Sequence, residues 1–373
     1  MKRLGGMSVG AALLANAVIL GVLVWASVLV ELDSDYYYRS VQEDESLEWA
    51  TFWGFALAAV LFWWAALKQR AEKGGLPWFF LLVGLFCFVV GMEEISWGQR
   101  VLGFRPPAYF LEHNFQQELN FHNVMDTGLR KLAVEGILWG YGVVLPILAL
   151  FGPIRRLLER VGIAAPPAFL VPAFLGSVLT YREYPWEFTG ELVELMFGMA
   201  MMFAALAALG AAWISLKGVL AATIVAAILG FGTAAVSRAR RDAQPGSLEA
   251  TDVEVEALKL DFEAYARSKN RPYLTRCGIH KRVFSYVEKY DRDRLYEGQF
   301  AGLKAQGLPE DRADFFIDPW NSPYWVRHKC DSDDPDRGVA IFLYSFGPNR
   351  KRDSSPWEIR GDDIGLVIEP QGR

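Results

Sequence analysis

The sequence contains few of the residues that most often build metal and redox sites. Its 373 residues include four histidines and three cysteines, and no closely spaced ligand motif such as H-E-x-x-H occurs. No nucleotide-binding loop, catalytic serine–histidine–aspartate signature or nucleic-acid motif stands out. The net charge of −5 gives no general basic character, so nucleic acid is not expected as a partner.

Long apolar runs are absent after residue 240, whereas they dominate the chain before it. Seven earlier stretches have about 17–25 mostly apolar residues, the length that crosses roughly 30 Å of hydrocarbon as a helix. These stretches lie at 8–30, 47–68, 77–97, 133–152, 164–181, 190–214 and 217–237. The sequence therefore predicts an α-helical membrane bundle of about seven spans. A bundle of this kind has membrane lipid as its immediate partner.

The composition divides the chain into three parts. Residues 1–216 are predicted to form a polytopic helical membrane domain, and residues 217–240 the last transmembrane helix and a linker. Residues 241–373 are predicted to form a polar domain outside the membrane. The span at 164–181 carries three prolines, which membrane helices tolerate when neighbouring groups satisfy the freed carbonyls.

Lysine and arginine gather in alternate loops, and this pattern predicts an orientation. The N-terminal MKRLGG and the loops KQRAEKGG and GPIRRLLERVG are basic, whereas the loops after the first and fifth spans are acidic. We expect a bacterial inner-membrane protein with a cytoplasmic N-terminus and, after seven spans, a periplasmic C-terminal domain. The basic stretch SRARR at 237–241 would then lie on the outer side, which opposes this orientation.

Two adjacent glutamates end the third predicted span. Glu93 and Glu94 lie within an apolar run, where ionised carboxylates are costly and usually mark a function or a specific pairing. Arg100 follows in the stretch GMEEISWGQR and is a natural ionic partner.

The loop after this span contains two of the four histidines, His113 and His122. Glu118 and His122 are spaced i,i+4, so in a helix they would share one face. A carboxylate and an imidazole one turn apart can ligate one metal ion.

Three interpretations of this polar region stay open. It could be a catalytic or metal site at the outer membrane face, it could bind a lipid headgroup, or it could be a structural network. In the first, the catalytic groups would be Glu93, Glu94, Arg100 and Glu118, and the ligands of a divalent transition metal would be His113 and His122.

The polar C-terminal part begins with a helical pattern. Val255, Leu258, Phe262 and Tyr265 recur at helical spacing and predict one apolar stripe. Thr251 with Glu254 matches a capping box. Downstream, YWVRHK and GVAIFLYSFG read as strands, which predicts a helix packed on a small antiparallel sheet in an α+β domain.

Three ordered motifs in this part carry a family resemblance. They are NRPYLTRCGI, DPWNSPYWVR, and FLYSFGPN followed by GDDIG. Together they resemble the globular domain of the major pseudopilin of type II secretion, in the type IV pilin superfamily. The membrane part resembles only uncharacterised bacterial membrane proteins.

The pseudopilin resemblance implies a calcium site in the last loop. Asp362 and Asp363 match the closing aspartates of that loop, and Asn349 stands where the family usually has aspartate. Calcium prefers six to eight oxygen ligands, so Asp353 or Glu358 would compensate for the lost charge at Asn349. The alternative is a loop held by arginine–aspartate pairs without metal.

Two cysteines of the C-terminal part form a natural pair. If the domain faces an oxidising compartment, Cys277 and Cys330 are expected to form a disulfide, and otherwise they are two free thiols. Cys87 lies in an apolar run and reads as a small buried side chain.

These features lead to one function hypothesis and two alternatives. The first is an inner-membrane protein that displays a pseudopilin-like domain as a scaffold or accessory of a secretion or pilus-like assembly. The second is an intramembrane metal-dependent hydrolase acting on a lipid or lipid-linked substrate. The third is a true pseudopilin cleaved after Gly218, although Thr223 then stands where the family has its assembly glutamate.

Overall fold

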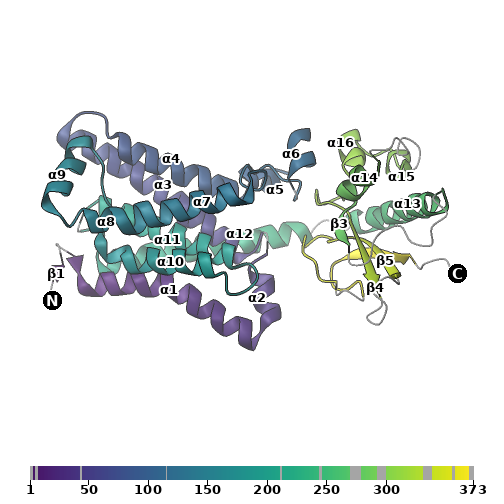
Figure 1. The fold of residues 1–373 in the computed structure, drawn as a ribbon, viewed down its shortest axis with the longest axis horizontal. Coiled ribbons are helices and arrows are strands. Elements are labelled where there is room, and N and C mark those ends of the chain that lie inside the picture. Colours follow the sequence, from purple (N-terminus) through teal and green to yellow (C-terminus); the bar gives the residue numbers. More distant parts are fainter. Residues whose placement is uncertain are drawn as a thin grey trace. The chain divides into compact units, whose positions relative to one another are not determined.

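The structure is a computed structural model. It describes residues 3–4, 7–42, 44–114, 116–210, 212–242, 246–268, 279–291, 300–330, 338–354 and 358–368. The chain forms two compact units, which we call the bundle and the sheet domain (Figure 1). The bundle comprises Met1–Gly98 and Asn120–Val236, and the sheet domain comprises Gln99–Leu119 and Ser237–Arg373.

The bundle consists almost entirely of helices. A short antiparallel pair, β1 (Arg3–Leu4) and β2 (Met7–Ser8), precedes them. The α-helices are α1 (Val9–Leu32), α2 (Ser34–Ser40), α3 (Ser46–Lys73), α4 (Trp78–Glu94), α7 (Thr127–Ile137), α8 (Leu145–Leu148), α9 (Gly152–Val161), α10 (Val171–Glu183), α11 (Thr189–Ala208) and α12 (Leu216–Asp242). Shorter segments are the 3-10 turns η1 (Ser96–Gly98) and η3 (Ala168–Leu170) and the π-helical η2 (Leu138–Val144), which joins α7 to α8.

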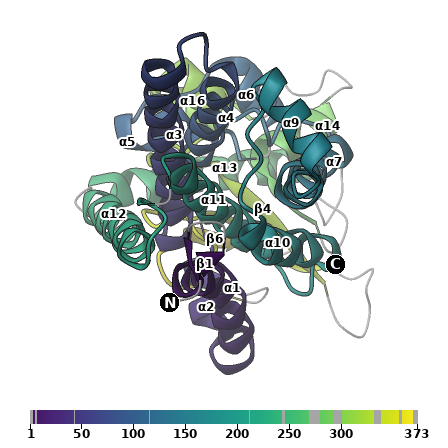
Figure 2. The ribbon, with the colours of Figure 1, turned by 90° about the vertical axis from the view of Figure 1, so that its left-hand side faces the viewer.

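Helix α11 lies in the centre of the bundle, surrounded by the other long helices (Figure 2). It packs against α1, α3 and α10, and nearly every residue from Leu192 to Leu206 is buried. This burial explains why α11 is apolar on all sides after Glu194, whereas a helix at the edge of a water-soluble domain has one polar face.

Among the described residues, five helices are long and apolar enough to cross a membrane. They are Val9–Leu32, Ser46–Lys73, Thr127–Leu148, Thr189–Ala208 and Leu216–Arg240. Each coincides with one of the seven predicted spans, so the prediction of a multi-pass membrane bundle is confirmed for these five. Their outer faces carry exposed apolar side chains such as Leu13 and Ile228, both 66% exposed, which suits contact with lipid rather than water.

The other two predicted spans form shorter helices. Prolines 166 and 167 delay the start of α10 to Val171, so its 13 residues extend only about 20 Å. Helix α4 has 17 residues, about 26 Å, and ends before Trp97, whose φ of 55° is left-handed.

Two glycines allow α3 and α11 to approach closely. A Cβ atom on Gly198 would lie 3.1 Å from the Phe55 ring and 3.3 Å from the Thr51 carbonyl, and one on Gly54 would lie 3.1 Å from the Gly198 backbone. Small residues at such crossings let membrane helices pack at short range.

We expect Gly198→Leu to destabilise the bundle by roughly 1–3 kcal/mol, because the side chain would be forced into occupied space. Thermal unfolding of the full chain in detergent, followed by helical circular dichroism, measures this loss. Gly21→Leu is the matched control, since nothing lies within 4 Å of a Cβ there. Equal shifts in the two variants would contradict the close crossing.

The sheet domain combines a four-stranded antiparallel sheet with helices. The sheet has the order β3-β4-β5-β6, with β3 (His280–Arg282), β4 (Trp325–Cys330), β5 (Gly338–Ser345) and β6 (Ile364–Ile368). The helices are α5 (Gln99–Leu102), α6 (Ala108–His113), α13 (Gly246–Ser268), α14 (Val283–Asp291), α15 (Gly302–Ala305) and α16 (Glu310–Asp314). The prediction of an α+β domain is confirmed at this level, and both predicted strands correspond to β4 and β5.

The predicted apolar stripe of α13 is buried against the sheet. Val255, Leu258 and Phe262 are in one core cluster with β4, β5 and β6, and Tyr265 packs at its margin. The predicted capping box is wrong, because α13 already begins at Gly246 and Thr251 lies inside the helix.

The segment DPWNSPYW forms a turn before β4 that is centred on a buried aspartate. Asp318 is fully buried and accepts backbone N–H groups of Trp320 and Ser322 at 2.9 and 2.8 Å. The Ser345 hydroxyl at the end of β5 donates to its other oxygen. Asp318 therefore connects the turn to the sheet, which explains a polar residue in this core.

Residues 99–119 leave the bundle after α4 and belong to the sheet domain. The buried Arg282 guanidinium donates to the carbonyls of Leu111 and Asn114. The Gln117 amide donates to the Phe315 carbonyl at 3.1 Å. These hydrogen bonds join residues 99–119 to the rest of the sheet domain, so the segment is a structural part of it.

The predicted disulfide concerns residues that cannot be placed. Cys277 and the side chain of Cys330 lie outside the described residues, so the pairing stays a prediction. Cys87 is a buried free thiol, as predicted.

Candidate functional site

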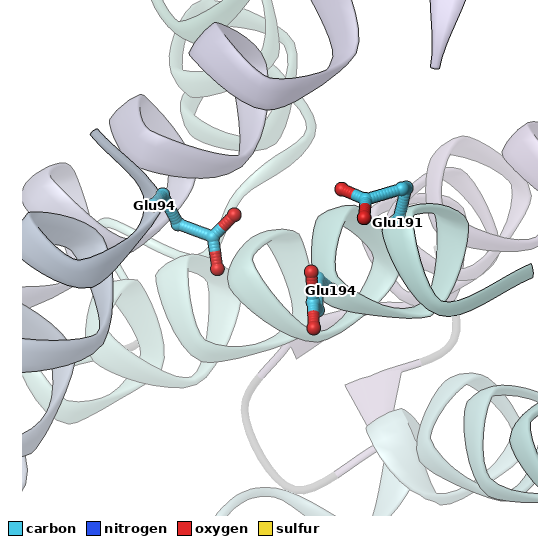
Figure 3. A group of neighbouring side chains, drawn as sticks. All are labelled: Glu94, Glu191 and Glu194. Atoms are coloured by element: carbon cyan, nitrogen blue, oxygen red, sulfur yellow. The ribbon is translucent and has the colours of Figure 1, made fainter. Parts of the chain in front are cut away.

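Three glutamates converge at one end of the bundle, and we call them the acidic triad: Glu94, Glu191 and Glu194. Glu94 is the last residue of α4, whereas Glu191 and Glu194 lie in the first two turns of α11 (Figure 3). One carboxylate oxygen from each lies within 4.8 Å of the others, and all three residues are half-buried. In the described part of the chain, this is the one group of three or more His, Cys, Asp or Glu residues with such spacing.

Other charged side chains of the described residues act on the acidic triad. Glu48, in the first turn of α3, lies within electrostatic reach of Glu94 and Glu194. Arg130 of α7 acts on Glu194 with the opposite sign. In the described part of the chain, Glu48 adds to the repulsion among these carboxylates and Arg130 opposes it. A bound cation would relieve this repulsion.

The donor atoms of the acidic triad define which ion it suits. Only carboxylate oxygens are offered, and hard cations such as Mg²⁺, Mn²⁺ and Ca²⁺ prefer oxygen ligands. Three protein ligands leave coordination positions for water or substrate, an arrangement that supports catalysis rather than a closed structural site.

Glu191 and Glu194 were missed by sequence analysis, although a signal for them exists. They interrupt the apolar run GELVELMF and are spaced i,i+3, so they share a helix face. The same cost of carboxylates in apolar runs that singled out Glu94 applies to both.

Glu93 belongs to a separate network with the predicted ligand His122. Its Oε1 accepts the Trp97 indole N–H at 2.6 Å, and its Oε2 accepts the backbone N–H of Phe121 at 2.6 Å. The His122 Nδ1 lies 3.4 Å from the same oxygen. Glu93 is buried and holds the returning loop, while the imidazole keeps its other nitrogen for further chemistry.

The loop around His122 is not helical, so the expected i,i+4 pairing of Glu118 with His122 is wrong. Asn114 is the cause, because its side chain accepts the N–H of Gln116 at 2.8 Å and donates to the Glu118 carbonyl at 2.7 Å. Gln117 then has a left-handed φ of 56°. Asparagine side chains that bond nearby backbone groups in this way favour turns over helix.

The remaining predicted site residues belong to the sheet domain. His113 is exposed, stacks on the Tyr109 ring with centroids 4.4 Å apart, and has its Nδ1 2.9 Å from the Tyr109 carbonyl. Glu118 is buried, and its carbonyl accepts from the Asn114 side chain. The side chain of Arg100 lies outside the described residues.

The predicted calcium residues lie in one loop of the sheet domain. Asp353 Oδ2 accepts from the Asn349 side chain at 2.6 Å and from the Asp362 N–H at 3.0 Å. Asp363 accepts the N–H groups of Asp353 and Ser354 at 3.3 and 2.9 Å. Asp353, which the sequence offered as a compensating ligand, is therefore the centre of this loop.

Burial changes the acidity of three aspartates in the sheet domain. It raises the pKa values of Asp261, Asp318 and Asp363 to about 6, although their hydrogen bonds act in the opposite direction. Their folded pKa values lie above the usual value of about 3.9 for unfolded chains. The stability that protonation contributes is therefore complete below about pH 4 and is lost as pH rises through about 6.

When the pH falls from 7 to 5, we expect the free energy of unfolding of the sheet domain to rise. The rise should be roughly 1 kcal/mol larger in the wild type than in the Asp318→Asn variant. Asparagine reproduces the neutral carboxyl and keeps an oxygen for the two N–H groups. Urea unfolding of the full chain, read by protease cleavage, measures both profiles. His280, whose pKa burial lowers to about 4, acts in the opposite direction in both proteins, so only their difference is diagnostic. Asp252→Asn, at an exposed position on α13, should reproduce the wild-type profile.

The fold and this site define a class: a multi-pass membrane protein with five candidate spans, an acidic triad in its bundle and an α+β domain of four antiparallel strands. Comparison of the chain with protein-family models, with curated proteins and with solved structures found no match.

Proposed function

We propose that this protein is a divalent-cation-dependent membrane hydrolase that acts on a lipid or lipid-linked substrate at the outer membrane face. The observation that carries the proposal is the convergence of three glutamates from α4 and α11 within one ion's reach. Carboxylates inside a membrane bundle are rare and usually functional, and oxygen-only ligands suit Mg²⁺ or Mn²⁺.

The geometry supports an activated water as the nucleophile. A cation on the acidic triad would lower the pKa of its bound water and polarise the carbonyl or phosphoryl oxygen of the substrate. A carboxylate of the acidic triad would accept the water proton as the base. The water oxygen then bonds to the acyl or phosphoryl centre, and the leaving alcohol takes up a proton.

The test uses the full-length protein purified in detergent and stripped with EDTA. We expect it to bind Mn²⁺ with a Kd below about 1 mM and to hydrolyse components of a bacterial lipid extract only when Mg²⁺ or Mn²⁺ is restored. Binding without hydrolysis would remove the enzymatic part of the proposal. Absence of binding would remove both parts.

A second candidate function rests on the sheet domain. Its helix α13 packs on an antiparallel sheet, in the order that the pseudopilin resemblance implies, with DPWNSPYW leading into β4. This supports a periplasmic pseudopilin-like domain that serves as a scaffold or accessory of a secretion or pilus-like assembly. Chemical crosslinking in secretion-competent bacteria should recover components of such an assembly. Recovery of none would leave this candidate without support.

The calcium site and the disulfide accompany this second candidate as proposals. Calcium would be held by Asn349, Asp362 and Asp363 with Asp353 between them, and the disulfide would join Cys277 and Cys330. Both are compatible with an oxidising, calcium-containing periplasm.

A further inference from the structure

A cavity of about 590 Å³ lies in the bundle at the end opposite to the acidic triad. It is lined by the ends of α3 and α11, whereas the acidic triad lies at the end of α4 and the start of α11. Its volume is within the range of about 300–1,000 Å³ that small-molecule sites occupy. The cavity is therefore a candidate site independent of the acidic triad.

One wall of this cavity is cationic. Lys68, Gln69 and Lys73 come from the last turns of α3, and Arg155 comes from α9. Two glutamates also line the cavity, but they lie 3.9 Å from Lys68 and from Arg155, at the limit of an ion pair. Lys68 also donates to the Leu209 carbonyl at 2.8 Å. Exposed pairs of this length contribute little, so Lys73 and Arg155 keep donors for an anionic ligand.

The other wall is apolar and continues onto the bundle surface. Phe80, Pro146 and Leu150 line the cavity, and Leu150 is 69% exposed. Leu76, in the connection between α3 and α4, is 72% exposed. A cavity that has a cationic wall and an apolar opening suits a ligand that is itself anionic at one end and apolar at the other.

Helix α9 has the character of a helix in the membrane interface. Arg155, Arg156 and Arg160 give it a basic side, while Leu157 and Val161 are exposed apolar residues. Its C-terminal end is fixed by the indole N–H of Trp78, which donates to the Val161 carbonyl at 3.0 Å. Tryptophan is typical of the headgroup level of a bilayer, so the cavity is placed where phospholipid headgroups lie.

We propose that this cavity binds the phosphate headgroup of an anionic phospholipid. Lys73 and Arg155 contact the phosphate, and the acyl chains leave along Leu150 into the bilayer. Basic pockets between membrane helices recognise such headgroups by charge-assisted hydrogen bonds to phosphate oxygens.

The test compares phosphatidylglycerol with phosphatidylcholine of the same acyl chains, titrated onto the full-length protein in detergent and followed by native mass spectrometry. We expect Lys73→Gln with Arg155→Gln to weaken phosphatidylglycerol binding by about 10-fold or more. The matched control is Arg156→Gln with Arg160→Gln, which removes the same charge from α9 outside the cavity lining and should change binding less than about 2-fold. Ala165→Trp fills the cavity without changing charge and should also weaken binding.

Three results would overturn the proposal. Equal losses in both double variants would show attraction to surface charge alone. Equal affinity for the two lipids would show that the phosphate environment is not selective for an anionic headgroup. Displacement of the lipid by millimolar inorganic phosphate would identify a soluble phosphate as the ligand.

Discussion

Glu194→Gln is expected to lower the affinity of the bundle for Mn²⁺ by at least about 100-fold, because losing even a supporting residue around a metal costs about 10–100-fold. Glu194 is the residue of the acidic triad on which Arg130 and Glu48 both act, so its carboxylate is central to the local charge balance. Electron paramagnetic resonance of free Mn²⁺ in a titration of the full-length protein measures the affinity.

A second readout separates loss of a ligand from general damage. With EDTA present, the variant should be at least as heat-stable as the wild type, because one of four mutually repelling carboxylates is neutral. Saturating Mn²⁺ at 100 times Kd should stabilise the wild type by about 2.7 kcal/mol and should not stabilise the variant. Glu183→Gln, at an exposed position in α10, is the matched control and should behave as the wild type. Equal stabilisation of all three proteins would show that the cation binds elsewhere.

Arg312→Met is expected to destabilise the sheet domain by about 3–5 kcal/mol, because it leaves a buried carboxylate without its partner. Glu254 is 2% exposed and pairs with the Arg312 guanidinium, and it also accepts the Tyr324 hydroxyl at 2.6 Å. Arg312 Nε donates to the Ile317 carbonyl at 2.9 Å. This network connects α13, α16 and the start of β4, so its loss should loosen all three.

Urea unfolding of the full chain in detergent, read by protease cleavage within the sheet domain, measures this loss. Glu256→Gln on the same helix is the control, since its pair with Lys259 is largely exposed and should contribute less than about 1 kcal/mol. The double variant Glu254→Leu with Arg312→Met should recover much of the stability, because no unpaired charge remains. A single variant as stable as the control would contradict the buried ion pair.

The membrane bundle could be predicted from local features because lipid imposes a length and a composition on each helix separately. Five of the seven predicted spans coincide with candidate spans for this reason. The fifth predicted span shows the limit of this argument. Its apolar length was sufficient, but Pro166 and Pro167 delay the helix, and composition alone does not locate a helix start.

The loop after α4 shows the same limit for the contacts of single residues. The i,i+4 spacing of Glu118 and His122 predicts a shared face only if the segment is helical. Asn114 and Gln117 form a turn instead, and this turn is stabilised by Arg282 from a distant part of the chain. Local spacing could not reveal a contact that is made across more than 160 residues.

For the candidate site, one residue could be predicted from its local sequence, whereas its partners depend on long-range contacts. Glu94 could be singled out from the sequence, because a carboxylate in an apolar run is costly wherever it lies. Its partners Glu191 and Glu194 could not be assigned, because nearly 100 residues separate them from Glu94 and only the packing of α4 beside α11 brings them together.

The amino-acid sequence alone determined that this protein has membrane helices, a polar C-terminal domain with one amphipathic helix and two strands, and carboxylates placed within apolar runs. These properties follow from the transfer of individual side chains between water and lipid or a protein core, which depends on residue type and short-range periodicity. Only the tertiary structure decided which carboxylates meet, that residues 99–119 belong to the sheet domain, and that a cationic cavity lies at the other end of the bundle. These features arise from contacts between segments far apart in the chain, where no local pattern specifies the partner.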